Sequence, residues 1–154
     1  MKKYEFTGET KQIDYLFKTV TLHRIKAVVS FGLIKAGELG GWVEKEENLS
    51  HEGNAWVYDN AEVSGNAWVY DNAEVFSASH VLVIGAIGSR NDFTTFYRDK
   101  DKDISVKCGC FKGKIDKFLE KVTQTHGDSK HALVYRTAVE VAKLQIDLTE
   151  EKSK

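Results

Sequence analysis

The feature that most constrains this fold is a tandem repeat in the middle of the chain. Residues 53–64 (GNAWVYDNAEVS) recur at 65–76 with only the last residue changed. An aliphatic residue stands at every sixth position, two residues after a small one. The aliphatic residues are Val57, Val63, Val69, Val75, Val81 and Ile87, and the small ones are Ala55, Ala61, Ala67, Ala73, Ser79 and Gly85. A period of six fits neither an amphipathic helix nor an alternating strand.

This period predicts a parallel β-helix over residues 37–88. Each group of six residues, here called a hexad, would supply one short strand and one bend, and three hexads would close one triangular coil. Coils would stack at the usual strand spacing of about 4.8 Å. Pairs such as Asp59-Asn60 and Gly65-Asn66 suit the bends, because Asn and Gly tolerate positive φ.

These residues resemble the hexapeptide-repeat superfamily, and the resemblance implies that the β-helix is left-handed. The stretch at 39–50 (LGGWVEKEENLS), followed by the Gly-Asn-Ala-Trp-Val repeats, resembles phage- and prophage-encoded proteins of this type. The resemblance therefore implies a phage setting. It says little about mechanism, since those proteins are mostly uncharacterised.

The flanks complete a predicted fold that is mainly β. Residues 1–36, with strands at 4–7 and 20–31, would form an N-terminal β cap on the β-helix. Residues 89–148 would form a ββαα unit, and residues 149–154 a polar tail.

Within the ββαα unit, strands are predicted at 93–98 and 104–111, joined by a charged turn. A helix follows, because apolar residues recur with helical spacing at Ile115, Phe118, Leu119 and Val122. A second helix, capped by Asp128 or Ser129, would bury an apolar face made of Leu133, Ala138, Val141 and Ala142.

Composition excludes several classes of protein. With 22 basic and 23 acidic side chains, the chain lacks the excess positive charge that sequence-independent binding of nucleic acid requires. It has no apolar run of about 18 residues for a membrane span, and its N-terminus has no signal-peptide core. The two cysteines make no disulfide framework. We therefore expect the cytoplasm of the bacterial host.

The superfamily resemblance raises the question of acyl transfer, for which such enzymes often use a histidine base. His80 lies three hexads after Glu62, so the two would stack on adjacent coils, where the carboxylate could raise the basicity of the imidazole. The alternative is a solvent-exposed pair without function. We predict a binding protein that is not an enzyme and has no cofactor.

A metal site is a further alternative. Cys108 and Cys110 would face the same side of a strand, and His126 and His131 follow. One residue between the cysteines is fewer than zinc sites usually have. The other interpretation packs both cysteines under the first C-terminal helix, so no metal is predicted.

The best candidate ligand site is the polar stretch that leaves the last coil. Its glycines free backbone N–H groups, and its side chains offer a guanidinium, an amide and hydroxyls, which are groups that hold a phosphate. The predicted ligand-binding residues are Ser89, Arg90, Asn91, Thr94, Thr95, Tyr97, Lys107, His126 and Arg136. The alternative is a loop that only ends the β-helix.

Five aromatic residues flank the core valines and are predicted to point outward. They are Trp56, Tyr58, Trp68, Tyr70 and Phe76. Exposed aromatic rows of this kind are usually covered by a partner, so we expect a homo-oligomer with these residues at its interface. The superfamily resemblance implies that it is a trimer or larger.

Together these features predict an oligomeric phage accessory protein that sequesters a small anionic ligand, such as a nucleotide signal of host defence. Two alternatives stay open: a hexapeptide-repeat acyltransferase, and a structural module that inhibits a host protein through its aromatic face.

Overall fold

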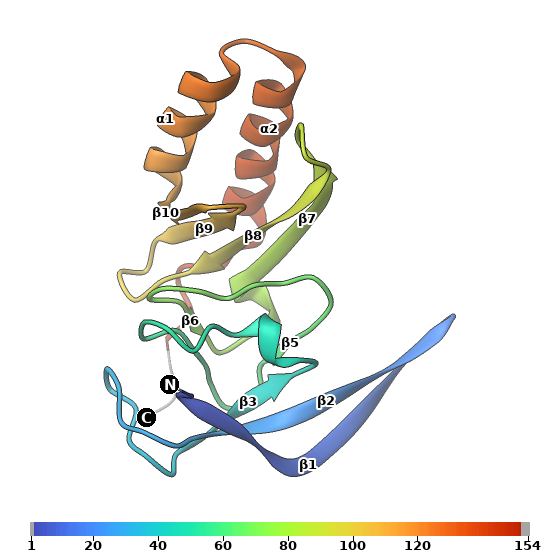
Figure 1. The fold of residues 1–154 in the computed structure, drawn as a ribbon, viewed down its shortest axis with the longest axis vertical. Helices are drawn as coiled ribbons and strands as arrows, with labels where there is room; N and C mark the ends of the chain where they lie inside the picture. Colours follow the sequence, from blue (N-terminus) through green and yellow to red (C-terminus); the bar gives the residue numbers. More distant parts are fainter. Residues whose placement is uncertain (1, 152–154) are drawn as a thin grey trace.

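The computed structural model describes residues 2–151, so the predicted polar tail at 149–154 lies partly outside the described residues. The chain builds a lower part from residues 2–80 and an upper part from residues 81–151 (Figure 1). Each part has its own buried cluster of hydrophobic side chains.

The lower part begins with a long antiparallel hairpin, β1 (Tyr4–Tyr15) and β2 (Lys18–Ala27). It projects from the body as an arm (Figure 1). β3 (Leu39–Val43) pairs antiparallel with β2 and parallel with the two-residue strand β5 (Glu62–Val63), which gives the sheet order β1-β2-β3-β5. β4 (Trp56–Val57) pairs parallel with β6 (Glu74–Val75). Short 3-10 turns lie at Glu46–Asn48 and Ala78–His80.

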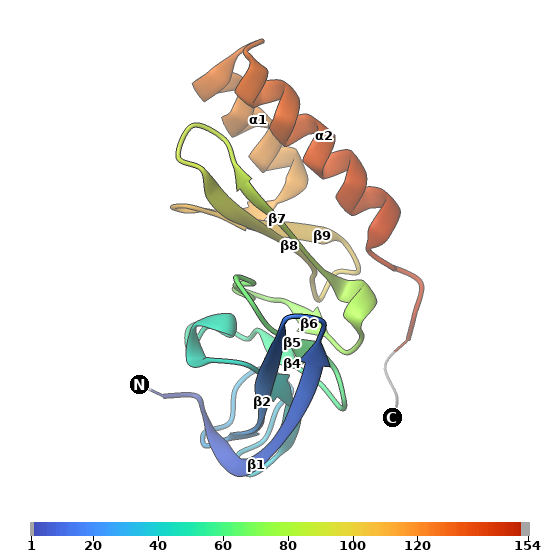
Figure 2. The ribbon, with the colours of Figure 1, turned by 90° about the vertical axis from the view of Figure 1, so that its right-hand side faces the viewer.

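The upper part is an antiparallel sheet covered on one face by two helices (Figure 2). Its strands are β7 (Val81–Ile87), β8 (Asp92–Arg98), β9 (Ile104–Cys108) and β10 (Phe111–Lys114), in the order β10-β9-β8-β7. The helices are α1 (Ile115–His126) and α2 (Lys130–Gln145).

Strand β8 joins the two parts. Because side chains alternate along a strand, Phe96 packs into the cluster under the helices, and Tyr97 packs into the cluster of the lower part. Both residues are fully buried. Backbone contacts reinforce the junction: Lys100 N–H donates to Asn72 O at 3.0 Å, and Asp147 N–H donates to Ser79 O at 3.0 Å.

The prediction of a left-handed parallel β-helix is wrong. The described residues form small antiparallel and mixed sheets and two helices. Among the described residues, parallel pairing in the predicted β-helix is limited to two stretches of two residue pairs, β3 with β5 and β4 with β6, and one isolated bridge, Leu49 with Val69. After Val75 the 3-10 turn at Ala78–His80 redirects the chain, so the last predicted repeats form β7, which pairs antiparallel with β8.

The C-terminal unit agrees more closely with expectation. The two predicted strands and both helices are present, and Ser129 caps α2 by accepting a hydrogen bond from Ala132 N–H. The predicted apolar face of α2 is partly wrong, because Leu133 is 64% exposed while Tyr135 and Val139 are buried. Within residues 2–151, neither helix has the length and apolar character needed to cross a membrane.

Candidate functional site

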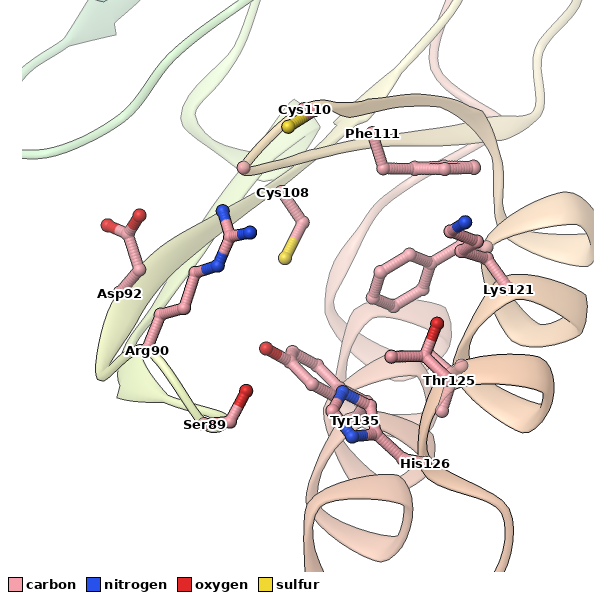
Figure 3. Close-up of a pocket in the computed structure, with 13 residues that line it drawn as sticks. Ser89, Arg90, Asp92, Cys108, Cys110, Phe111, Lys121, Thr125, His126 and Tyr135 are labelled. Carbon is pink, nitrogen blue, oxygen red and sulfur yellow. The ribbon is translucent and has the colours of Figure 1, made fainter.

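A cavity of about 260 Å³ opens at one end of the upper part, between the sheet and the helices (Figure 3). Its walls come from the β7–β8 turn, the β9–β10 turn and the facing sides of α1 and α2. The lining residues are Ser89, Arg90, Asp92, Cys108, Gly109, Cys110, Phe111, Phe118, Lys121, Val122, Thr125, His126 and Tyr135.

The β7–β8 turn can approach the helices closely because Gly88 has no side chain. Gly88 has φ +79°, and a Cβ there would overlap the Tyr135 hydroxyl. Asn91 also has a positive φ, 50°, which Asn tolerates better than most residues. These two residues bend the chain so that Ser89 and Arg90 lie beside the cavity.

Cys108 lies at the centre of the polar wall, and Figure 3 shows its sulfur between the Arg90 guanidinium and the Tyr135 ring. Its Sγ accepts a hydrogen bond from Thr94 Oγ1 at 3.3 Å. Burial raises the pKa of Tyr135 to about 12, and the charge and the hydrogen bond of Cys108 act in the same direction. The Tyr135 hydroxyl is thus engaged with Cys108 at this wall of the cavity.

Two cations on the wall make the cavity suitable for an anion. The guanidinium of Arg90 lies beside Gly109, and Lys121 projects from α1. Within residues 2–151, neither side chain has an ion pair, and Asp92 is the one carboxylate of the lining. Positive charge therefore exceeds negative charge around the space.

The histidines lie at the helix side of the cavity. The His126 ring stacks on Tyr135 with centroids 5.8 Å apart and lies 5.5 Å from the His131 ring. His126 is half-buried and lines the cavity, so its imidazole can meet a ligand.

Of the predicted ligand-binding residues, the structure brings three to the cavity: Ser89, Arg90 and His126. Thr94 supports the site through Cys108. Thr95 and Tyr97 alternate with Thr94 along β8, so they face the lower part, where Thr95 accepts a hydrogen bond from Trp68 N–H.

The other predicted ligand residues have structural contacts elsewhere. Lys107 lies over the Trp68 ring. Arg136 donates hydrogen bonds to Thr123 Oγ1 and Gly127 O, and so braces the connection between the helices. Asn91 shapes the turn without lining the cavity.

Sequence reasoning missed Lys121, Thr125 and Phe111 as site residues. A signal for the first two was present, since Lys121 and Thr125 follow Phe118 by three and seven residues and so share its side of α1. No comparable pattern marked Phe111.

The predicted His80–Glu62 pair does not form. His80 is fully buried: its Nδ1 accepts a hydrogen bond from Phe76 N–H, and its Nε2 lies 3.3 Å from both Arg98 Nη1 and Glu150 Oε2. Burial, and then Arg98, lowers its pKa. Glu62 instead forms an ion pair with Lys11. The turn at Ala78–His80 explains the separation, because it ends the repeat before residue 80 could stack over residue 62.

The four predicted metal ligands do not form a cluster. Cys108 and Cys110 both line the cavity, but Cys110 lies in the β9–β10 turn and not on the strand. Among residues 2–151, no group of three or more His, Cys, Asp or Glu side chains is placed to hold a metal ion.

The predicted row of outward aromatics is also changed. Trp56 is fully buried and packs edge-on against Tyr4 and Phe31 of its own chain. Gly40 makes room for it, because a Cβ at Gly40 would lie 2.6 Å from Trp56 Cζ2. Tyr58, Tyr70 and Phe76 are half-buried, and Trp68 is 44% exposed. Homo-oligomerisation stays a prediction, but Trp56 cannot take part in it.

A comparison with models of known protein families finds no match. Over 68 residues the chain is 36% identical to a protein of Escherichia coli (strain K12) named uncharacterized acetyltransferase YdcK. The match covers 42% of this chain and 21% of that protein, so the chain matches about a fifth of its relative's length. This similarity overturns the prediction that the chain is not an enzyme. It supports the repeat-family resemblance at most, and carries no link to phages.

Proposed function

We propose that the chain binds a small anionic ligand in the cavity between the upper sheet and the helices. The observation that carries this proposal is the pair of cations, Arg90 and Lys121, which line the cavity without an ion pair among residues 2–151. A guanidinium and an ammonium beside neutral donors are the groups that recognise phosphate or carboxylate. Ser89 and Tyr135 line the cavity and carry hydroxyl groups of this kind.

The phage resemblance extends this proposal to a biological use. In a phage protein inside a bacterial host, the ligand would be a nucleotide signal of host defence. Binding in the cavity would withdraw it from its receptor.

Native mass spectrometry of the full chain tests the proposal, after incubation with a nucleotide-containing bacterial extract. We expect an added mass on the order of a few hundred daltons per subunit, the size of ligand that such cavities hold. Arg90→Ala and Lys121→Ala should lose it. Lys117→Ala is the matched control, because Lys117 lies on the same helix, exposed and outside the cavity. Retention of the ligand by both cavity variants would refute the site.

The similarity to a protein named an acetyltransferase favours a second candidate function, acyl transfer. His126, unlike the buried His80, is the histidine that lines the cavity. It would accept the proton of an acceptor group as that group attacks an acyl thioester and the thiol leaves.

This second candidate predicts release of free coenzyme A from acetyl-coenzyme A in the presence of bacterial extract, measured by chromatography. His126→Gln should abolish the release, and His23→Gln, in the arm, should retain it. Absence of release by the wild-type chain would remove acetyl transfer from consideration.

A further inference from the structure

A second cavity, of about 150 Å³, adjoins the first one. The two share Asp92 and Gly109, which lie at the end of the upper sheet. The second cavity lies toward the lower part, and its other lining residues are Asn66, Trp68, Phe93, Thr95 and Lys107. The two spaces therefore meet around the end of the sheet.

Two aromatic side chains from different parts of the chain meet at the second cavity. Trp68 is 44% exposed and Phe93 is 37% exposed. Contacts with the upper sheet hold both residues in position. The Trp68 backbone N–H donates to Thr95 Oγ1 at 2.9 Å, and the Phe93 ring packs on Gly85. Exposed rings held in this way form a surface on which a flat ring can stack.

Cations stand on both sides of Gly109. Arg90 approaches it from the first cavity. Lys107 donates from Nζ to Gly109 O at 2.5 Å, and the same Nζ lies 4.6 Å from the Trp68 ring centroid. Positive charge therefore continues from the first cavity into the second, alongside the aromatic surface. Asn66 and Asp92 add hydrogen-bonding groups at the edge of the second space.

We propose that the ligand is a nucleotide, whose phosphate binds at Arg90 and whose base stacks on Trp68 and Phe93 in the second cavity. This inference rests on the proposed function, and it adds where the base and the phosphate of the nucleotide bind. The sugar would pass round the end of the sheet at Gly109, which has no side chain of its own and lies between Arg90 and Lys107. Asn66 and Asp92 would then read the edge of the base.

Calorimetric titration of the full chain separates the contributions of base and phosphate. The probes are AMP, UMP and ribose 5-phosphate, which carries the same phosphate and sugar without a base. Stacking of one base on aromatic side chains should make at least one nucleotide bind about tenfold more tightly than ribose 5-phosphate.

Variants then assign the base to Trp68. Trp68→Ala should reduce nucleotide affinity to that of ribose 5-phosphate and leave ribose 5-phosphate binding unchanged. Trp68→Phe should restore most of the loss. Arg90→Ala should weaken binding of all three probes. Phe17→Ala is the control, because Phe17 is a 93% exposed aromatic residue at the tip of the arm.

The outcomes distinguish this inference from the proposed function. If ribose 5-phosphate binds through Arg90 and neither base adds affinity, the base site is wrong and the anion site stands. The same conclusion follows if Trp68→Ala weakens all probes equally. If none of the three probes binds, both proposals fail.

Discussion

The two copies of the repeat differ in sequence only at the last residue, but they have very different surroundings. Trp56, in the first copy, is fully buried, whereas Trp68, at the same place in the second copy, is 44% exposed. At the turns the backbone is similar, since Asp59 and Asp71 have φ values of 53° and 54°. The local sequence therefore gives the same turn in both copies, whereas the tertiary contacts determine that Trp56 is buried and Trp68 is partly exposed.

The difference arises because the two copies pair with each other out of register, so that equivalent positions are not neighbours. Trp56 pairs with Glu74, three hexads further on, and Val57 pairs with Val75. One copy is only two hexads long, so a shift by one copy leads to another side of the lower part. There Trp68 meets β8 of the upper sheet through Thr95, while Trp56 meets Tyr4 and Phe31.

The largest predicted difference between the copies is the response to loss of the tryptophan. Trp56→Ala should lower the free energy of unfolding by about 3–5 kcal/mol, as truncation of a buried Trp does. Trp68→Ala should cost about 1 kcal/mol or less, since its ring is partly in solvent. Urea denaturation of both variants measures the difference. Similar losses would mean that Trp68 is buried in solution, as an oligomer interface would require.

The second largest predicted difference is the loss of stability on substitution of the glycine at the start of each copy. Gly53 and Gly65 have φ values of 69° and 64°, so alanine at either position should cost about 1–2 kcal/mol. A Cβ at Gly53 would also lie 2.7 Å from Asp71 O, whereas Gly65 has nothing within 4 Å. We expect Gly53→Ala to destabilise more than Gly65→Ala in the same urea assay. Equal losses would show that Asp71 moves without cost.

Tyr58 and Tyr70 occupy the same position in the two copies, and they should contribute differently to stability in alkaline solution. Burial, and then Glu74 and Glu38, raises the pKa of Tyr58 to about 12, whereas in the unfolded chain it ionises near 10. The folded state therefore holds the proton longer, and stability falls as pH rises from about 10 to 12. Tyr58→Phe should make this fall shallower, as measured by urea denaturation across that range. Tyr70→Phe, which loses a surface hydrogen bond to Glu52, should leave the contribution of Tyr58 in place.

The smallest predicted difference concerns the two aspartates with positive φ. Asp59→Gly should be neutral or stabilising by up to about 1 kcal/mol, because glycine adopts this conformation without strain. Asp71→Gly should gain less, since it also removes the ion pair with Lys112 at 3.5 Å. Thermal unfolding of both variants decides the order. A clear loss of stability in Asp59→Gly would show that its side chain makes a contact of its own.

Sequence predicted the upper part better than the lower one. The helical spacing of Ile115, Phe118 and Val122 identifies α1 and its buried side, because the apolar pattern of an amphipathic helix lies within the helix's own sequence. The repeat also recorded a real pattern, and every valine from Val57 to Val75 is buried. It could not show that the chain turns at Ala78–His80, because Ser79 and Val81 continue the pattern.

The candidate site was only partly predictable, for a related reason. Arg90 stood out because it lies in a glycine-bounded polar turn. Tyr135 and Lys121 meet Arg90 only because two helices fold back over the sheet. The positions of those residues depend on packing angles that no local pattern specifies. His80 was misjudged for the same reason, since its burial depends on Arg98 and Glu150.

The mismatch between a duplication of two hexads and a pairing distance of three hexads limits how such a gene can change in length. One more copy inserted after residue 76 would carry β7 and everything after it to a different side of the lower part. Tyr97 would then lose its contact with the buried valines of the repeat. We therefore expect natural length variants of this region to avoid the addition of a single copy, because it would separate Tyr97 from the buried valines that it packs against.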